Sequence, residues 1–451
     1  MNKRLFGSDG VKGIANTELN CETAFKIGQA AALVSFAKTD VAPRILVGRD
    51  TRISGHMLES ALIAGICSVG GHVESVGVIP SPAISYLVKK YKMDAGVSIS
   101  ASHKPMEYNG IKIFDSDGYK ITTEVEDHIE DYVRGKIEFP QPKTGGELGR
   151  ISRTHTALRD YVDFVKSTIG ADLSDIKVAI DCANGCASHT AERLFTKLGA
   201  DVTMLGNTPD GFNINTSGST RIDALMEYVA ENKLDCGIAF DGSGERCLAV
   251  DENGCLVDGD VIIAACAGYM QKQGTLRNNS ILVTQANNMG LIRFARENGI
   301  GTAAAPTGER GMMRRMLECG FSIGGDPSGH IIFPDDMPAA DGQLTGIRLL
   351  EAMKAAEKKM SELAEIIEKC PQVMLNVPIE NKYREVWKNN RTITSMIDEF
   401  ESILGDEGRV IVRETGAEPV IRIRIEGRDF SAINTMALSL ADTIKEQLSE
   451  E

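Results

Sequence analysis

The sequence predicts an α/β protein built from three related mixed α/β sandwich domains and a C-terminal α+β domain. Short β-prone runs alternate with helix-length amphipathic segments, which is the pattern of βαβ units. This pattern starts again twice along the chain, and its character changes after Pro371. A chain of 451 residues also exceeds what one hydrophobic core usually organises, so several domains are expected.

The first domain is expected over residues 1–150. Three apolar runs are predicted strands, and the two amphipathic segments between them are predicted helices: 44–50, 57–71, 72–80, 83–91 and 95–100. The Gly- and Pro-rich segment 139–149, FPQPKTGGELG, is the expected linker to the next domain.

The second domain is expected over 151–255 and the third over 256–370. The second begins with the apolar run IKVAIDCANG at 176–185 and ends with a hairpin whose turn is DENG. The third begins with SILVTQANN at 280–288 and continues with further short helices and strands up to a charged helix predicted over 351–370. No strict sequence repeat accompanies these restarts.

The fourth domain is expected over 371–451, with a β-α-β-β-α order. Its predicted strands lie at 373–379, 409–414 and 420–427, and its predicted helices lie near 392–404 and at the end of the chain. Apolar residues alternate in these strands instead of running continuously, which predicts a sheet with one solvated face.

Composition excludes several classes of function. The net charge of −14 and the pI near 5.2 argue against charge-driven binding to nucleic acid or to anionic membranes. The longest apolar stretches are too short to span a bilayer and no signal-type apolar segment is found, so we expect a cytoplasmic protein without membrane insertion. The ten cysteines are scattered without the paired spacing of a zinc site, which favours buried free thiols.

Polar clusters follow the predicted strands, where open α/β sheets generally build their sites. The first cluster, FGSDGVKG, contains Asp9 and Lys12 between glycines. Taken alone, it is more typical of an ordinary turn.

The second cluster, SASHKP, follows the predicted strand 95–100 and is followed by a second basic residue, Lys112. Ser102 and His103 could indicate a hydrolase, but the frame of a nucleophile elbow is missing. A hydroxyl beside Lys104 and Lys112 is better suited to carrying a phosphoryl group. Without further information, a plain polar loop explains these residues equally well.

The third cluster is FDGSGER, in which Asp241, Ser243 and Glu245 alternate after a buried strand. If the backbone stays extended, the three side chains point the same way, and such oxygen ligands suit a hard cation such as Mg²⁺. Arg246 stands where an EF-hand requires glycine, so this loop is not an EF-hand. The alternative is a purely structural turn.

The fourth cluster, GGDPSGH, presents Asp326, Ser328 and His330, a set that can recognise sugar hydroxyls. The fifth, RETGAEPVIR, places Arg413 and Arg422 on either side of a Thr-Gly turn, which is typical of an anion site. Glycine-rich turns with charges are also common in loops without function.

Taken in order, the five clusters resemble the α-D-phosphohexomutase superfamily over nearly the whole chain, and within it the bacterial phosphoglucosamine mutases. The segments GRDTRISGHMLESALIAGICSVG, DCANG and PDGFNIN also look like that group. The resemblance implies four domains around a central active-site cleft. It also implies an enzyme that moves phosphate between O6 and O1 of a hexose through a phosphoserine and a hexose 1,6-bisphosphate intermediate, with glucosamine phosphate for cell-wall precursor synthesis as the expected substrate.

The resemblance assigns roles residue by residue. Ser102 would carry the phosphoryl group, and Mg²⁺ would be held by this serine together with Asp241, Ser243 and Glu245. The remaining assignments are catalytic or phosphate-handling roles for Lys12, His103, Lys112, Arg246 and His330, sugar recognition by Asp326 and Ser328, and binding of the other phosphate by Arg413, Thr415 and Arg422. The expected partner is a small-molecule phosphosugar, no nucleic acid is expected, and a homodimer is compatible with the resemblance.

Nearly every motif differs from the family's usual form. ASHNP reads ASHKP, D-G-D-x-D-R reads DGSGER, G-V-R-G reads GVKG, G-E-x-S-G-H reads GDPSGH, R-x-S-G-T-E-P reads RETGAEP, and G-D-R reads Gly308-Glu309-Arg310. The metal loop loses one carboxylate at Ser243 and gains a longer one at Glu245, which predicts looser binding of Mg²⁺. Lys12 cannot form the bidentate phosphate contact of an arginine.

Two alternatives to a working glucosamine phosphate mutase therefore stay open. One is a mutase-like paralogue with weak or no activity that binds phosphosugars or regulates a partner. The other is an enzyme with shifted sugar specificity, which would explain the altered sugar loop but not the altered metal loop.

Overall fold

The structure is a computed structural model that describes residues 4–7, 9–39, 41–306, 308–384, 386–414 and 419–448. The chain divides into two compact units. Unit 1 comprises Met1–Thr284 and Gly301–Ile366, and unit 2 comprises Gln285–Ile300 and Ile367–Glu451.

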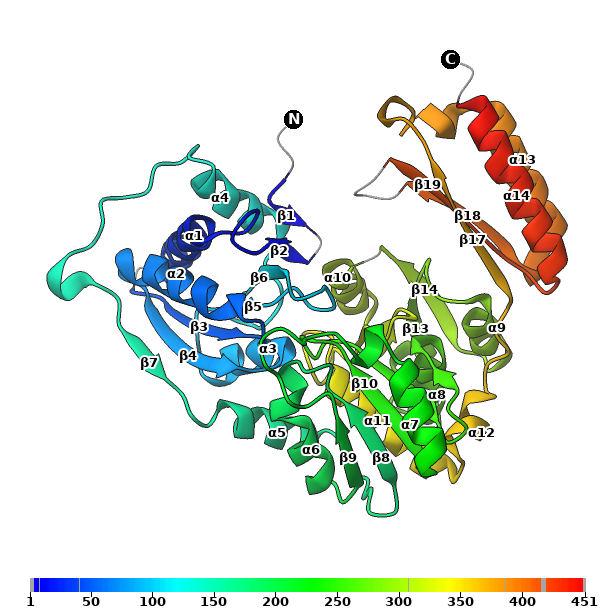
Figure 1. The fold of residues 1–451 in the computed structure, drawn as a ribbon, viewed down its shortest axis with the longest axis horizontal. Helices are drawn as coiled ribbons and strands as arrows, with labels where there is room; N and C mark the ends of the chain where they lie inside the picture. The colour runs from blue at the N-terminus through cyan, green and yellow to red at the C-terminus, as the bar shows by residue number, and fades with distance from the viewer. Residues whose placement is uncertain are drawn as a thin grey trace. The chain divides into compact units, whose positions relative to one another are not determined.

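The first sheet of unit 1 has seven strands in the order β1-β2-β6-β5-β3-β4-β7 (Figure 1). Strands β3, β4 and β5 are parallel, as their predicted βαβ connections require, whereas β6 runs antiparallel between β5 and β2. The strands are β1 (Phe6–Gly7), β2 (Gly10–Ile14), β3 (Arg44–Arg49), β4 (His72–Val78), β5 (Ala95–Ile99), β6 (Tyr108–Phe114) and β7 (Ile151–Arg153).

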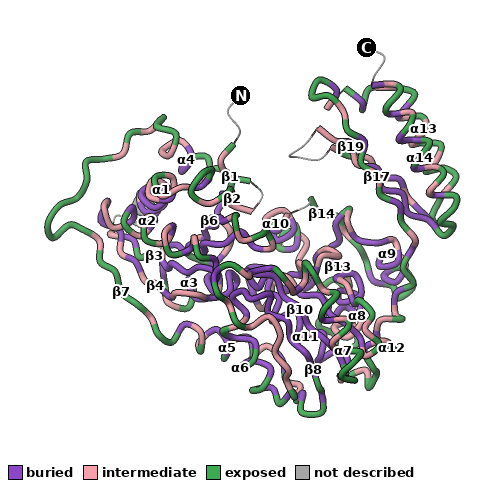
Figure 2. Tube along the Cα trace, viewed as in Figure 1, coloured by how far each residue is buried: buried purple, intermediate pink, exposed green. Residues whose placement is uncertain are grey.

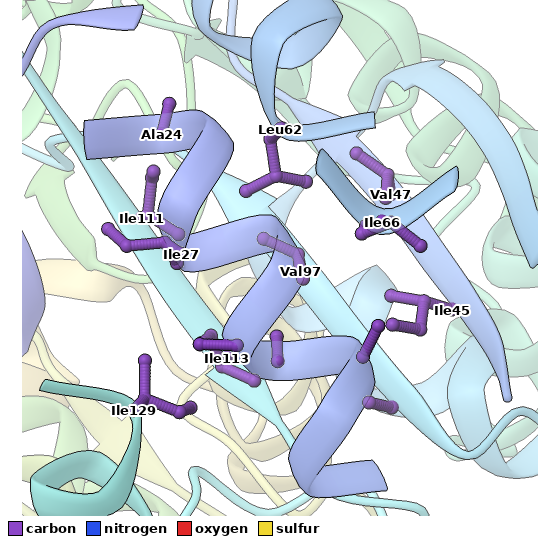
Figure 3. Packing of buried hydrophobic residues seen from close by; sticks show 14 of the residues in the cluster. Ala24, Ile27, Ile45, Val47, Leu62, Ile66, Val97, Ile111, Ile113 and Ile129 are labelled. Carbon is purple, nitrogen blue, oxygen red and sulfur yellow. The ribbon is translucent and has the colours of Figure 1, made fainter. Parts of the chain in front are cut away.

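Helices cover both faces of this sheet. One face packs against α1 (Cys21–Thr39), α2 (Ser54–Ser68) and α4 (Thr123–Val133), where a cluster of aliphatic side chains is buried (Figure 3). The other face packs against α3 (Ser81–Lys90). Helices α1 and α2 approach closely at Gly28 and Gly65, where an added Cβ would lie 2.2 Å and 2.1 Å from backbone oxygens of the facing helix.

The second sheet of unit 1 has the order β12-β11-β10-β8-β9, with three parallel strands and an antiparallel hairpin at one edge. Its central strand is buried along its whole length, which explains its continuous apolar sequence (Figure 2). The elements are α5 (Ala157–Ser167), β8 (Lys177–Asp181), α6 (Ala191–Lys197), β9 (Asp201–Leu205), α7 (Asp223–Asn232), β10 (Cys236–Phe240), β11 (Cys247–Asp251) and β12 (Leu256–Val257).

The third sheet has the order β14-β13-β15-β16 and also belongs to unit 1. The single helix predicted over 351–370 is wrong: α11 ends at Ala356 because Glu357 adopts a left-handed backbone with φ of 54°, and a short α12 follows. The elements are α8 (Gly259–Lys272), β13 (Ser280–Thr284), β14 (Gly301–Ala305), α10 (Glu309–Cys319), β15 (Gly324–Gly325), β16 (Ile331–Ile332), α11 (Gly342–Ala356) and α12 (Met360–Ala364).

Unit 2 contains an antiparallel sheet of order β17-β19-β18. Alternate residues of β19, namely Ile421, Ile423 and Ile425, lie in the apolar core with α13 and α14, as predicted, but the opposite face is only partly solvated because Arg424 and Glu426 are buried there. The elements are α9 (Met289–Glu297), β17 (Gln372–Pro378), α13 (Arg391–Leu404), β18 (Arg409–Glu414), β19 (Val420–Glu426) and α14 (Phe430–Gln447). Within the described residues of the whole chain, no helix is both long enough and apolar enough to cross a membrane.

Candidate active site

Ser102 lies in the loop that follows β5. It is 3% exposed and adopts a left-handed backbone with φ of 55°, which is uncommon for a residue other than glycine. Its backbone N–H donates to Ser100 Oγ at 3.0 Å. Such a conformation costs free energy, so the surrounding structure must impose it.

A buried arginine holds this loop in place. The Arg52 guanidinium is fully buried, pairs with Asp50 at 2.9 Å, and donates to the carbonyl oxygens of Ser102 at 3.0 Å and Lys104 at 2.7 Å, and also to that of Pro105. An arginine can serve several carbonyls at once because its donors form a rigid planar fork.

Asn215 connects the same loop to the loop after β10. Its Nδ2 donates to the carbonyl oxygens of Ser102 at 2.8 Å and Lys104 at 2.9 Å, and its Oδ1 accepts from the Gly242 N–H at 2.8 Å. The serine loop and the predicted metal loop are therefore joined through one side-chain amide.

The metal loop places its oxygens next to Ser102. Ser102 Oγ donates to Asp241 Oδ2 at 2.6 Å, and Ser243 Oγ lies 2.9 Å from that same oxygen and 2.8 Å from Glu245 Oε2. The other Asp241 oxygen accepts from the backbone N–H groups of Glu245 and Arg246, which fixes the carboxylate. The loop is a turn and not the extended segment on which the prediction depended, yet its side chains converge.

These four residues fit a hard cation. Two carboxylates and two hydroxyls, all buried, present oxygens within hydrogen-bond distance of one another. Mg²⁺ prefers oxygen ligands and needs few from the protein when phosphate and water supply the others. The loop offers two carboxylates where the family's usual motif offers three.

Glu245 also forms a buried ion pair. Both of its carboxylate oxygens lie 2.6 Å from the Lys112 ammonium, whose residue is 1% exposed. Burial alone would raise the pKa of Glu245, but the positive charge of Lys112 outweighs it and lowers that pKa to about 2. The carboxylate is therefore ionised at neutral pH.

The Asp9 carboxylate contacts three lysines near the metal loop. Its carboxylate lies 2.5 Å from Lys12, 2.6 Å from Lys120 and 3.2 Å from Lys112. Burial opposes the ionisation of Asp9, but the three ammonium groups hold its pKa well below the usual range. Burial likewise lowers the pKa of Lys12, which lies near the positive charge of Lys112.

Asp9, Glu245 and Glu309 bring carboxylate oxygens within 4.8 Å of one another. The negative charges of these three carboxylates are already neutralised by lysines. Lys112 contacts Asp9 and Glu245, and Lys120 contacts Asp9 and Glu309. A divalent cation there would have to displace both Lys112 and Lys120, whereas at the oxygens around Ser243 it would compete only with Lys112 for Glu245, so the oxygens around Ser243 are the better candidate metal site.

Two buried nitrogens beside Ser102 have no hydrogen-bond partner in the described part of the chain. They are His103 Nδ1 and Arg246 Nε. Burial, and then the nearby charge of Arg246, lower the pKa of His103 to about 4, so the imidazole is neutral at pH 7. Unpartnered buried nitrogens of this kind are costly unless a ligand meets them, and the N–H of Arg246 suits an anion such as a phosphoryl group.

The predicted sugar loop joins β15 to β16. Asp326 Oδ1 accepts from the Ser328 N–H at 2.9 Å and from Ser328 Oγ at 2.5 Å, so the two residues are locked together. His330 Nε2 lies 2.9 Å from Glu309 Oε2. Burial would lower the pKa of His330, but the hydrogen bond to Glu309 and its charge raise it.

The predicted phosphate-binding arginines lie in unit 2. Arg413 and Arg422 face each other across β18 and β19, and Arg422 Nε donates to Asn376 Oδ1 at 2.9 Å. Burial, and then the neighbouring positive charge of Arg422, lower the pKa of Arg413. Thr415, which was predicted with them, lies outside the described residues.

The structure thus brings together all the predicted residues of unit 1 except Asp326 and Ser328, for which no contact with the serine or metal loop is described. Sequence reasoning did not assign roles to Asp9, Lys120, Glu309 or Arg52. Asp9 lies in a quoted motif and Glu309 replaces a motif aspartate, so both carried a signal, whereas Lys120 carried none.

Comparisons with known proteins show the family. Four family models match the chain in order: phosphoglucomutase/phosphomannomutase alpha/beta/alpha domains I, II and III over residues 3–139, 159–254 and 258–370, and the C-terminal domain over 374–443. Phosphoglucosamine mutase of Acetivibrio thermocellus is 48% identical over 99% of both chains, and that of Clostridium acetobutylicum is 45% identical over 98% of this chain and 99% of the relative.

Solved structures share the fold at lower identity. A phosphoglucomutase/phosphomannomutase family protein of Burkholderia thailandensis superposes with a TM-score of 0.82 at 22% identity, covering 98% of this chain and 97% of the other. N-acetylphosphoglucosamine mutase of Aspergillus fumigatus, in complex with GlcNAc-6P and magnesium, has a TM-score of 0.69 at 14% identity, covering 98% and 96%. A variant of that fungal enzyme in complex with glucose 1,6-bisphosphate has a TM-score of 0.62 at 14% identity, covering 99% and 96%.

The four matched domains and the full-length identity to curated mutases exceed what a shared fold alone would give. This chain belongs to the phosphoglucomutase/phosphomannomutase family of the α-D-phosphohexomutase superfamily and is a phosphoglucosamine mutase-like intramolecular phosphotransferase.

Proposed function

We propose that this chain interconverts glucosamine 6-phosphate and glucosamine 1-phosphate for cell-wall precursor synthesis, with Ser102 as the phosphoryl carrier. The contact of Ser102 Oγ with Asp241 at 2.6 Å carries the proposal, because it sets a buried hydroxyl against an oxygen-rich metal loop. Under this proposal the domains are divided near residues 150, 255 and 370. The 45% and 48% identical relatives named above are phosphoglucosamine mutases, which supports the substrate.

In the proposed reaction, the bond between phosphorus and Ser102 Oγ breaks as a bond to a sugar hydroxyl oxygen forms, giving a hexose 1,6-bisphosphate. The sugar then returns its other phosphoryl group to Ser102, so no phosphate is lost. The hydroxyl proton passes to a nearby base, for which Lys12, whose pKa is lowered by burial, and His330 are the candidates, while the Lys112 ammonium would neutralise phosphate charge. Phosphoryl transfer depends mainly on positioning and positive charge.

The cationic side chains have separate tasks in this proposal. His103 and Arg246 would donate to the phosphoryl oxygens at Ser102, because both carry buried nitrogens without partners. Arg413, Thr415 and Arg422 would hold the phosphate that is not being transferred. Asp326 and Ser328 would recognise the sugar, with a glucosamine ammonium suited to the carboxylate.

Mg²⁺, when bound, would neutralise charge on the transferring phosphoryl group. The phosphate on Ser102 and the oxygens of Asp241, Ser243 and Glu245 would hold it. The fungal relatives in complex with magnesium and with glucose 1,6-bisphosphate support both ligands for this chain.

Two further parts of the proposal concern the cellular location and the oligomeric state of the enzyme. The ten free cysteines suit a reducing compartment, which supports a cytoplasmic location. A homodimer is also proposed, to be checked by the molar mass of the purified protein in solution.

The test is phosphorus NMR of the purified protein with Mg²⁺, glucose 1,6-bisphosphate as primer and glucosamine 6-phosphate as substrate. We expect the 1-phosphate to appear with the wild type and with Ser167→Ala, a control on the exposed end of α5, and to be absent with Ser102→Ala. Conversion by Ser102→Ala at the wild-type rate would exclude the phosphoserine.

The altered metal loop favours a second candidate, a paralogue that binds phosphosugars with weak or no turnover. Ser243 supplies no charge, and Glu245 is engaged by Lys112. If glucosamine, glucose and mannose 6-phosphates all bind but none is converted, this second function replaces the first.

A further inference from the structure

A continuous line of polar contacts runs from Lys12 to His330 through three residues to which the proposed reaction gives no task. Lys12 Nζ lies 2.5 Å from Asp9, Asp9 lies 2.6 Å from Lys120, Lys120 lies 3.0 Å from Glu309, and Glu309 lies 2.9 Å from His330 Nε2. Lys12 and His330, both proposed for proton transfer, are therefore the two ends of one chain of ion pairs and a hydrogen bond.

The middle of this line is buried. The side chains of Lys120 and Glu309 are 7% and 4% exposed. Burying an ion pair costs desolvation free energy that its attraction often fails to repay, so stability alone is a weak reason for this pair. A better explanation for the buried pair is that it positions Lys12 and His330 at the two ends of the line.

The line also joins distant parts of the sequence within unit 1. Asp9 lies in the turn between β1 and β2, Lys120 follows β6, Glu309 is the first residue of α10, and His330 ends the loop before β16. A carboxylate at a helix N-terminus is stabilised by the partial positive charge of the helix end, and α10 fixes the backbone from which Glu309 reaches His330.

Glu309 constrains the imidazole in a specific way. Its carboxylate is ionised, because burial opposes but the charge of Lys120 lowers the pKa of Glu309. An ionised carboxylate only accepts hydrogen bonds, so Nε2 of His330 must carry the proton in their contact. Nδ1 is then the ring nitrogen left to meet a ligand, and no hydrogen bond of Nδ1 is found within the described residues.

We propose that Glu309 is a positioning residue that holds His330 in the Nε2–H form with Nδ1 directed to the substrate, and that Lys120 ties this pair to Asp9 and the active-site lysines. The inference rests on the proposed function, since His330 needs a defined ring orientation only if it serves the phosphosugar. A carboxylate that orients a histidine in this way fixes both its tautomer and its angle.

The test begins with the ligand-free full-length protein. Long-range nitrogen-15 NMR distinguishes histidine tautomers, and the sequence has only seven histidines, so comparison with His330→Gln identifies the His330 ring. The spectra are recorded at alkaline pH, where the His330 ring is neutral although Glu309 raises its pKa, and we expect the Nε2–H form in the wild type and a mixture of tautomers in Glu309→Gln. Glu318→Gln is the matched control, because Glu318 is also on α10 and ion-paired, at 2.8 Å to Arg314, but on the exposed side.

The second readout is steady-state turnover of glucosamine 6-phosphate. Misplacing a catalytic group by about 1 Å costs on the order of 100-fold, so we expect kcat of Glu309→Gln to fall by about that factor with little change in KM. Glu309→Asp, which keeps the charge on a shorter side chain, should recover part of the loss. Lys120→Met provides a second variant if Glu309→Gln does not fold, and it should also disturb the His330 tautomer.

The inference is overturned if Glu309→Gln leaves the His330 tautomer unchanged or if, with an active wild type, it turns over like Glu318→Gln. The tautomer is measured without substrate, so the inference and the proposed function can fail separately. If Glu309→Gln changes the His330 tautomer but the wild type converts no hexose phosphate, the role of Glu309 is supported and the proposed mutase function is rejected.

Discussion

Restoring the missing carboxylate of the metal loop should make the protein less stable without metal and more responsive to Mg²⁺. Ser243 is fully buried, and its hydroxyl lies 2.9 Å from Asp241 and 2.8 Å from Glu245. Ser243→Asp would replace the single hydrogen that this hydroxyl can donate to the two carboxylates by two contacts between like charges.

The magnitude follows from electrostatics. Two charges 4 Å apart interact by about 4 kcal/mol at an effective dielectric constant of 20, so two such contacts could cost about 8 kcal/mol. The new carboxyl can instead take up a proton, which at pH 7 costs only about 4 kcal/mol for a group whose pKa is about 3.9. We therefore expect a loss of at most about 4 kcal/mol in EDTA.

Mg²⁺ would reverse the sign of the effect of Ser243→Asp on stability, because the third carboxylate becomes a metal ligand instead of a repelling neighbour. An affinity gain of at least tenfold, or about 1.4 kcal/mol, is expected by titration calorimetry with MgCl₂. Ser243→Asn, which has the same shape as aspartate without its charge, is the control. If Ser243→Asp is as stable as Ser243→Asn in EDTA and binds Mg²⁺ no more tightly than the wild type, the assignment of these oxygens to the metal is wrong.

Three other predictions concern stability, pH and substrate binding. Arg52→Met should destabilise unit 1 by about 3–5 kcal/mol, because it leaves a buried carboxylate unpaired, and urea unfolding measures this loss. Burial raises the pKa of Asp341 to about 6 although Tyr161 donates to it, so the folded protein holds that proton more tightly than the unfolded chain, whose pKa is near 3.8. Wild-type stability should therefore fall as pH rises from about 4 to 6, and the melting temperature of Asp341→Asn should show no such fall. Arg422→Gln should raise KM for the phosphosugar by about 10- to 100-fold, since hydrogen bonds to charged groups contribute about 1.5–3 kcal/mol.

Each of these predictions has its own contrary outcome. An Arg52→Met protein that unfolds at the wild-type urea concentration would show that the buried guanidinium contributes nothing net. Parallel pH profiles of wild type and Asp341→Asn would show that the buried carboxyl does not titrate near pH 6. Arg428→Gln, an exposed arginine beyond the end of β19, is the control for Arg422, and an equal rise of KM in both variants would indicate a general charge effect.

Local pattern was enough to predict the strands and helices between residues 44 and 100 and the β-α-β-β-α order after Pro371, but it did not predict α1, α4, β2 or β6. Continuous apolar runs such as β10 are buried along their whole length, whereas alternate isoleucines of β19 enter the apolar core, so the spacing of apolar residues distinguishes them. The pattern failed for the helix predicted over 351–370, because its amphipathic spacing continues across Glu357 while the backbone there turns left-handed.

The oxygens of the candidate metal site could also be anticipated, because Asp241, Ser243 and Glu245 are neighbours in one loop. The network of ion pairs formed by Asp9, Lys120 and Glu309 could not be anticipated from the sequence. Lys120 is 111 positions from Asp9 and 189 from Glu309, so only the tertiary packing of unit 1 brings these charges together. A lysine without a motif gives no indication in the sequence of which carboxylate it will meet.

The amide of Asn215 has one further consequence. Asn215 joins the Ser102 loop to the metal loop, and Arg52 donates to the same carbonyl oxygens of Ser102 and Lys104. The serine is therefore fixed relative to Asp241. A nucleophile fixed in this way cannot swing from one end of a bisphosphate to the other. In a mutase cycle both transfers must then happen at a single stationary point, and it is the sugar that has to be presented there twice, in opposite orientations.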